Sequence, residues 1–164
     1  MRIHDGPIAR CASKGGKVMT RFSVLVLSMV LTAAFADSDT DSNAKDLEKM
    51  QGDWAVVSFV VDGVKAEDDN AQSLFRTVKG NQYTVFLFDK PLATGTFKID
   101  ATKKPKTIDF TPDKMAGKSI LGIYQMDGDT IKTCYAPPGK DRPTQFSSKK
   151  GPEHTLMVWE REKK

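Results

Sequence analysis

Short runs of apolar residues alternate with polar turn residues along the chain from Trp54 onward. The runs recur about every 8 to 12 residues, a spacing typical of an antiparallel sandwich or barrel. The breaks hold residues that favour tight turns, such as Asp62-Gly63 and Asp127-Gly128-Asp129. The pattern predicts an all-β, up-and-down antiparallel barrel of about eight strands, at residues 54–61, 74–78, 83–88, 93–99, 107–110, 120–126, 130–136 and 156–161.

Three segments outside this strand pattern have other expected structures. Residues 37–46 are polar and acidic, which predicts a flexible linker before the barrel domain at 47–164. Residues 47–50 are expected to form a single helical turn. Residues 67–75 could form a short helix that crosses from the first strand to the second.

Period-two alternation assigns side chains to the two faces of the predicted strands. Cys134 alternates with inward residues and shares the outer face with Lys132, so we expect its thiol to be accessible. All three tyrosines fall on or near inward positions, where each hydroxyl needs a partner. We expect the ligand-contacting residues of the barrel interior to be Tyr83, Tyr124, Thr133 and Tyr135. The other inward positions are Trp54, Phe97, Ile99, Ile108, Phe110 and Ile131.

The first 36 residues have the pattern of a secretory leader. Residues 22–36 carry no charge, follow Arg21 and end in Ala34-Phe35-Ala36, a small-x-small cleavage pattern. The stretch is shorter than the roughly 20 residues that a membrane span needs. We therefore predict a signal peptide, a translation start at Met19, a mature chain that begins at Asp37, and an exported protein with no membrane span after cleavage.

The charge and cysteine content of the mature chain argue against nucleic-acid binding and against an intramolecular disulfide. The net charge of +4 comes from the leader, which holds five basic residues and one acid, leaving 20 basic and 20 acidic residues. A neutral domain lacks the basic footprint of a nucleic-acid-binding protein, so we expect no such partner. Cys11 leaves with the leader, and Cys134 alone cannot form an intramolecular disulfide.

The first and last strands of the predicted barrel carry residues typical of lipocalins. Gly52-Asp53-Trp54 opens the first strand, and Arg161 closes the last one. This arrangement resembles the lipocalins, in which the tryptophan of a G-x-W motif lies at the barrel floor under an arginine from the C-terminal end. The resemblance implies that Gly52, Trp54 and Arg161 form a structural floor.

A longer set of motifs covers nearly all of the mature chain and resembles one particular family. With these motifs the chain is similar to a small, uncharacterised lipocalin-like domain that is multiplied in planctomycete bacteria. The resemblance implies a secreted or envelope-facing barrel, and it carries no established ligand or catalytic residue. The motifs are residues 50–54, Val57-Ser58, Asp62-Gly63, residues 102–106 with Ile108-Asp109, residues 121–124, residues 128–130, and residues 134–140 with Arg142-Pro143.

The sequence offers few residues for catalysis or metal binding. His154 is the one histidine after the leader, and the H-E-x-x-H, G-x-S-x-G and P-loop spacings are absent. A Cys134/His154 pair is conceivable, but a strand cysteine and a surface histidine explain both residues. The acidic stretch Asp37, Asp39, Asp41, Asn43 and Glu48 matches the ligand spacing of a calcium loop, yet Ser42 stands where the turn requires glycine. We expect no catalytic residue, no metal and no cofactor.

These observations predict a monomeric, non-catalytic binding module for a small, partly apolar ligand. An eight-stranded barrel either holds one ligand or is filled by its own side chains. The alternative is therefore a filled barrel that serves as a structural or protein-interaction domain of the cell envelope. An interior volume above roughly 300 Å³ favours the first function.

Overall fold

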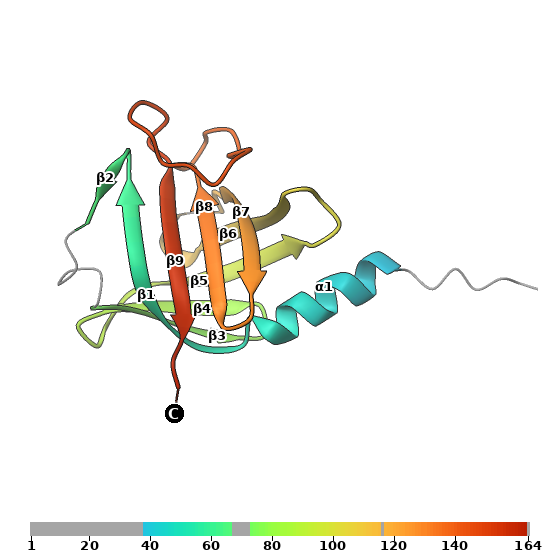
Figure 1. Cartoon of the computed structure of the whole chain (residues 1–164). Helices are drawn as coiled ribbons and strands as arrows, with labels where there is room; N and C mark the ends of the chain where they lie inside the picture. The colour runs from blue at the N-terminus through green and yellow to red at the C-terminus, as the bar shows by residue number, and fades with distance from the viewer. Residues whose placement is uncertain (1–37, 67–72, 116, 164) are drawn as a thin grey trace, which may run out of the picture. The chain divides into compact units, whose positions relative to one another are not determined.

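Turn residues divide the apolar runs into strands that pair with their neighbours in chain order (Figure 1). The computed structural model describes residues 38–66, 73–115 and 117–163. The predicted leader and residues 67–72 lie outside the described part of the chain. The strands are β1 (Gly52–Val61), β2 (Val64–Lys65), β3 (Leu74–Lys79), β4 (Gln82–Leu87), β5 (Lys90–Asp100), β6 (Lys106–Pro112), β7 (Ile120–Asp127), β8 (Thr130–Tyr135) and β9 (Thr155–Arg161).

All of these strands except β2 form a closed up-and-down barrel, which confirms the predicted fold class. The first strand closes it, because β1 pairs antiparallel with both β3 and β9. The β1–β9 ladder runs from Trp54 to Val61, whereas the β1–β3 ladder covers only Gly52 to Ala55. β1 and β3 are therefore hydrogen-bonded only at the end of the barrel where β1 begins.

The short strand β2 was not predicted, and it extends β1 through a hairpin. Asp62 and Gly63 form its turn with positive φ angles of 48° and 81°. Both values match a tight hairpin turn, for which Asp-Gly is a favoured pair. Of the alternative helix at 67–75, the described residues Leu74 and Phe75 belong to strand β3, so the helical prediction is wrong for them.

The predicted linker is wrong, and the helical turn predicted at residues 47–50 is part of a longer element, because residues 38–49 form one continuous helix, α1 (Ser38–Lys49). Lys45 pairs with Asp41 one turn earlier at 2.6 Å, which supports the helix locally. Leu47 packs against the barrel core, and Asn43 Oδ1 accepts a hydrogen bond from the Ala101 amide at 2.7 Å. Docking onto the barrel thus outweighs the weak helix propensity of this acidic stretch. The residues with calcium-loop spacing from Asp39 onward lie along this helix.

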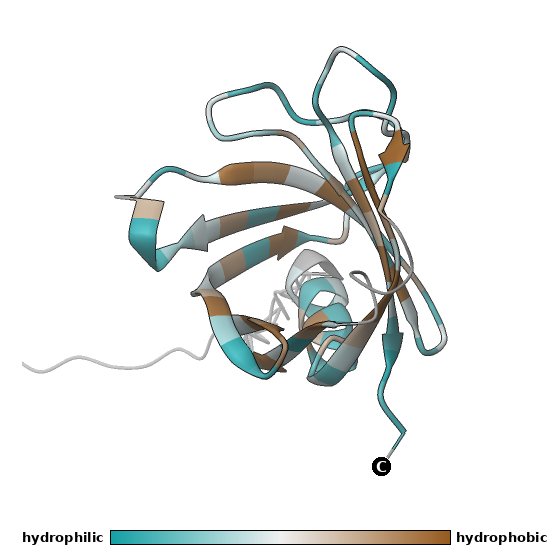
Figure 2. Cartoon of the chain, turned by 90° about the vertical axis from the view of Figure 1, so that its left-hand side faces the viewer, coloured by the Kyte–Doolittle hydropathy of each residue, from teal (hydrophilic) through white to brown (hydrophobic). Residues whose placement is uncertain are grey.

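Hydrophobic and hydrophilic residues alternate along several strands (Figure 2). The structure buries the predicted inward residues Phe97, Ile108, Phe110, Ile131 and Thr133. The core at the end next to α1 also contains Met50, Trp54, Val56 and Val78.

Cys134 corrects one part of the face assignment. Its neighbours Thr133 and Tyr135 line the barrel interior, so Cys134 lies on the outer face as predicted. The side chain is nevertheless fully buried, and its Sγ lies 3.5 Å from the carbonyl oxygen of Ser147. The segment between β8 and β9 therefore covers this part of the outer face, and the expected accessibility of the thiol is wrong.

Candidate ligand-binding cavity

The barrel interior is filled at one end and hollow at the other. A cavity of about 260 Å³ is lined by residues from β1, β3–β9 and the short 3-10 helix η1 (Asp113–Met115). Next to α1, between Met50, Val78 and Phe97, the remaining space is only about 10 Å³. The cavity is slightly smaller than the roughly 300 Å³ above which ligand binding is favoured over a filled barrel. It nevertheless exceeds the roughly 150 Å³ that suffices for benzene in a protein interior.

Aromatic side chains shape one wall of the cavity. Phe110 contacts Tyr83 edge-on with ring centroids 5.4 Å apart, and it contacts Tyr135 in the same way at 6.1 Å. Burial raises the pKa of Tyr135 to about 12 and also raises the pKa of Tyr83. Both hydroxyls are therefore neutral at physiological pH and available as hydrogen-bond donors.

Exposed apolar residues mark where the cavity meets solvent. Leu92 of β5 and Met115 of η1 line the cavity, although their side chains are exposed. Both positions lie away from the filled end at α1. The hollow is therefore reached from outside past apolar side chains, which suits a ligand with an apolar part.

Arg76 is the one charged residue among those that line the cavity. It is only 5% exposed, and its guanidinium carbon lies 4.4 Å from the centroid of the Trp159 ring. Its Nε is buried without a hydrogen-bond partner among the described residues. Desolvation lowers the pKa of Arg76 to about 10, so the group keeps its charge at neutral pH.

Three of the four predicted ligand-contacting residues line this cavity: Tyr83, Thr133 and Tyr135. Tyr124 lies elsewhere, at the filled end, where its hydroxyl donates to Asp46 of α1 at 2.7 Å. Arg76 was not among the predicted ligand-contacting residues. The alternation along β3 could have identified it, since Arg76 lies between the outward positions Phe75 and Thr77 and therefore points inward.

The three residues predicted to form the floor lie together at the filled end. Trp54 is fully buried and donates from Nε1 to the Met50 carbonyl, while the Arg161 guanidinium carbon lies 4.2 Å from the Trp54 ring centroid. Arg161 also donates to the carbonyl oxygens of Lys49 and Gln51 at 2.7 Å. A side chain at Gly52 would meet Arg161 Nη1 at 3.2 Å, and the φ of Gly52 is 106°, so this position requires glycine.

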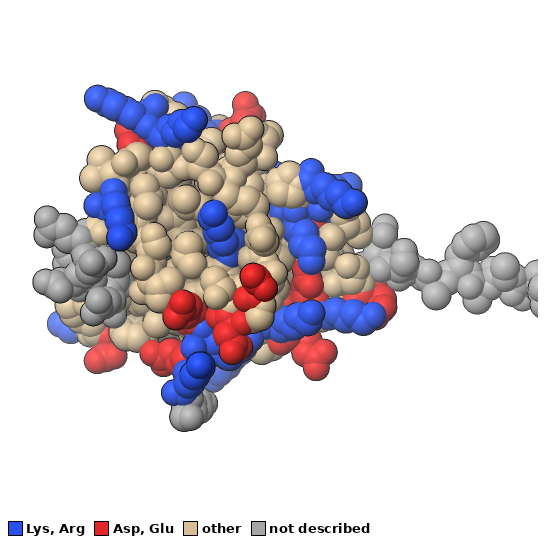
Figure 3. All heavy atoms as spheres, in the orientation of Figure 1, with Lys and Arg blue, Asp and Glu red and all other residues tan. Residues whose placement is uncertain are grey.

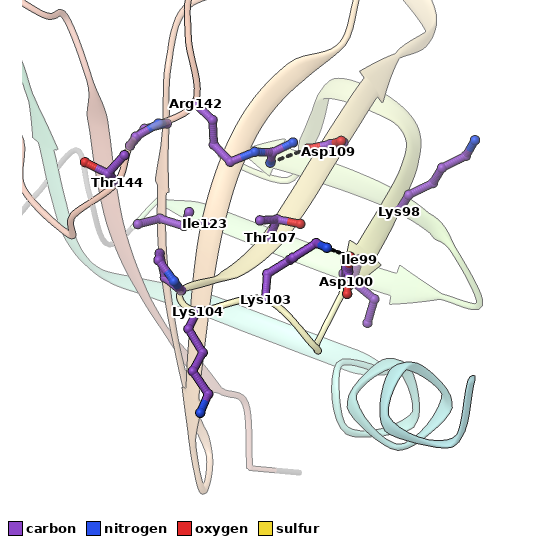
Figure 4. A pocket seen from close by; sticks show the side chains of 12 residues that line it. Lys98, Ile99, Asp100, Lys103, Lys104, Thr107, Asp109, Ile123, Arg142 and Thr144 are labelled. Atoms are coloured by element: carbon purple, nitrogen blue, oxygen red, sulfur yellow. Dashed lines mark hydrogen bonds and ion pairs between the residues drawn. The ribbon is translucent and has the colours of Figure 1, made fainter. Parts of the chain in front are cut away.

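A larger hollow, of about 580 Å³, lies on the outer surface and is lined by Lys98, Lys103, Lys104 and Arg142 (Figure 4). Its main cation already has protein partners, because Arg142 donates to Asp109 Oδ1 at 2.5 Å and to the Gly122 carbonyl at 2.6 Å. Lys103 lies 3.6 Å from Asp100. We therefore assign Arg142 a structural role in holding the β8–β9 segment against β6 and β7.

The remaining sequence candidates are not brought together. Within the described ranges no hydrogen bond joins Cys134 to His154, and no cluster of three metal-ligating side chains occurs. On the face shown in Figure 3, basic and acidic side chains are intermingled. Neither helix in the described part of the chain has the length and hydropathy of a membrane-spanning helix.

The fold and the cavity define a small closed β-barrel of a kind compatible with a binding domain. Comparison of the chain with protein-family models, curated proteins and solved structures finds no match.

Proposed function

We propose that this protein is an exported, non-catalytic binding module for a small, partly apolar ligand, in a lipocalin-like barrel. The observation that carries the proposal is the hollow half of the barrel, lined mainly by apolar side chains and reached past Leu92 and Met115. The resemblance to the secreted planctomycete domain and the signal-peptide pattern support export. N-terminal sequencing of the exported protein is expected to begin at Asp37.

A neutral fluorescent probe tests the binding function. N-phenylnaphthylamine, which fluoresces in apolar surroundings, is expected to bind saturably at one site per chain. Val85→Phe places a larger side chain on the cavity wall and is expected to weaken binding about tenfold or more. Val57→Phe is the matched control, since Val57 is exposed and does not line the cavity. No saturable binding, or equal binding by both variants, would contradict the proposal.

One observation favours the alternative of a protein-interaction domain in the envelope. Val57, Val61 and Val64 are exposed along β1 and the β1–β2 hairpin. Exposed apolar side chains on neighbouring strands are a feature of interaction surfaces. This alternative predicts that Val64→Asp abolishes association with the envelope fraction while probe binding is unchanged.

A further inference from the structure

The cavity contains a charge that the described residues do not balance. Arg76 projects from β3 into the interior, and no described acidic residue lies within ion-pair distance of it. A buried cation without a partner costs free energy, so its presence in an otherwise apolar cavity requires an explanation.

The cation–π contact with Trp159 does not supply the hydrogen-bond acceptors that the guanidinium group of Arg76 requires. The guanidinium carbon lies 4.4 Å from the Trp159 ring centroid, a cation–π contact that gives the N–H groups no hydrogen-bond acceptor. The N–H donors point outward in the guanidinium plane and form a fork that matches a carboxylate. Nε is buried and has no acceptor among the described residues.

Two tyrosines face the same space. The positive charge of Arg76 acts on the ionisation of both Tyr83 and Tyr135. The Tyr135 hydroxyl lies 3.2 Å from Met157 Sδ, a weak acceptor that a carboxylate oxygen would replace favourably. Arg76 and these hydroxyls thus supply convergent donors for an anion, while Leu74, Val85 and Phe110 supply apolar contacts.

We propose that the ligand is an amphiphilic carboxylate whose carboxylate group binds Arg76 and whose apolar body fills the rest of the cavity. This inference rests on the proposed binding function and specifies its ligand class. A single cation neutralises one negative charge, so a monoanion fits better than a doubly charged phosphate, which would leave a buried charge unpaired. The volume of about 260 Å³ suits a short alkyl or single-ring body.

A matched pair of probes tests the inference on the purified protein. Octanoate and octanol have the same chain length and differ in charge. Both are titrated while the intrinsic tryptophan fluorescence is followed, because Trp159 lines the cavity and Trp54 does not. Octanoate is expected to bind about ten- to a hundredfold more tightly, as for one charge-assisted pair. Arg76→Met retains the apolar length without the charge and is expected to abolish this preference. Arg76→Lys, which keeps the charge without the fork, is expected to retain part of it.

Arg161→Met is the control, because Arg161 also makes a cation–π contact with a tryptophan but lies at the floor outside the cavity. It is expected to leave the octanoate preference unchanged. Equal affinity for octanoate and octanol, or a preference that persists in Arg76→Met, would overturn the carboxylate inference and leave the binding function intact. If neither these probes nor N-phenylnaphthylamine binds, the proposed function itself fails. The comparison of the two probes on the unaltered protein decides the inference even if Arg76→Met does not fold.

Discussion

Trp54 and Arg161 join the helix, the first strand and the last strand. The Trp54 indole fills the closed end, and Arg161 covers it while donating to two carbonyl oxygens at the end of α1. Trp54→Ala is expected to reduce the free energy of unfolding by about 3–5 kcal/mol, since it removes a large buried ring and leaves a cavity. Arg161→Ala loses a half-exposed cation–π contact and hydrogen bonds, and is expected to cost about 2 kcal/mol.

Chemical denaturation of both variants measures this difference. Arg161→Lys is the matched control, because it keeps the charge but loses the two-carbonyl fork, and its loss should be smaller than that of Arg161→Ala. A loss below about 1 kcal/mol for Trp54→Ala would remove the assignment of Trp54 as the buried floor of the barrel.

Cys134 lies on the outer face of the barrel but is not exposed to solvent. Burial raises the pKa of the Cys134 thiol, and the β8–β9 segment covers it. We expect a thiol reagent to leave Cys134 unmodified in the folded protein and to modify it fully after denaturation. Modification of the native protein at the rate of an unfolded chain would show that the covering segment opens freely.

At the scale of elements, helix α1 is held to the barrel by a buried carboxylate. Asp46 accepts from Lys106 Nζ at 2.6 Å and from the Tyr124 hydroxyl at 2.7 Å, and it is only 7% exposed. Asp46→Ala leaves both donors without their acceptor and is expected to cost about 1.5–3 kcal/mol of stability. Asp41→Ala is the matched control on the same helix, since the Asp41–Lys45 pair is exposed and should contribute well under 1 kcal/mol.

Thermal unfolding followed by circular dichroism compares the two variants. Asp46→Asn, which retains an acceptor oxygen without the charge, should fall between Asp46→Ala and the unaltered protein. Equal midpoints for the Asp46 and Asp41 alanine variants would contradict the role of Asp46 in docking the helix.

The barrel strands were predictable because alternation is a local signal. Apolar residues at every second position, such as Phe97 and Ile108, indicate which face of a strand is buried. Turn pairs such as Asp62-Gly63 mark the ends of strands. Helix α1 was not predictable in this way, because its partners, such as Lys106 and Ala101, are distant in sequence. The same applies to the burial of Cys134, which depends on a covering segment that has no periodicity.

The candidate site was predictable in part. Alternation along the strands correctly predicted that Tyr83, Thr133 and Tyr135 point into the barrel interior. The same alternation along β3 also predicts an inward position for Arg76. Alternation predicts which face of the sheet a side chain occupies, but not at which end of the barrel the residue lies. Tyr124 therefore shared the inward pattern but lies at the filled end under α1, and the division into a filled and a hollow half emerged only from the packing.

For the whole molecule, the buried tyrosines make the free energy of unfolding depend on pH in the alkaline range. Burial raises the pKa of Tyr83, Tyr124 and Tyr135, and that of Tyr135 reaches about 12. In the unfolded chain a tyrosine ionises near pH 10, so between about pH 10 and pH 12 the folded state binds more protons than the unfolded state. This contribution to stability is fully present below about pH 10 and is lost as the pH rises through that range.

Arg76 acts in the opposite direction, because its pKa falls to about 10 on burial and the folded state then releases its proton before the unfolded state does. Three tyrosines shift stability in one direction and one arginine in the other, so we expect the free energy of unfolding from urea titrations to fall between about pH 10 and about pH 12. Tyr135→Phe should make this fall shallower, and Arg76→Met should make it steeper because the opposing group is gone. A free energy of unfolding that stays constant or rises over this range would contradict the burial of the tyrosine hydroxyls in the barrel.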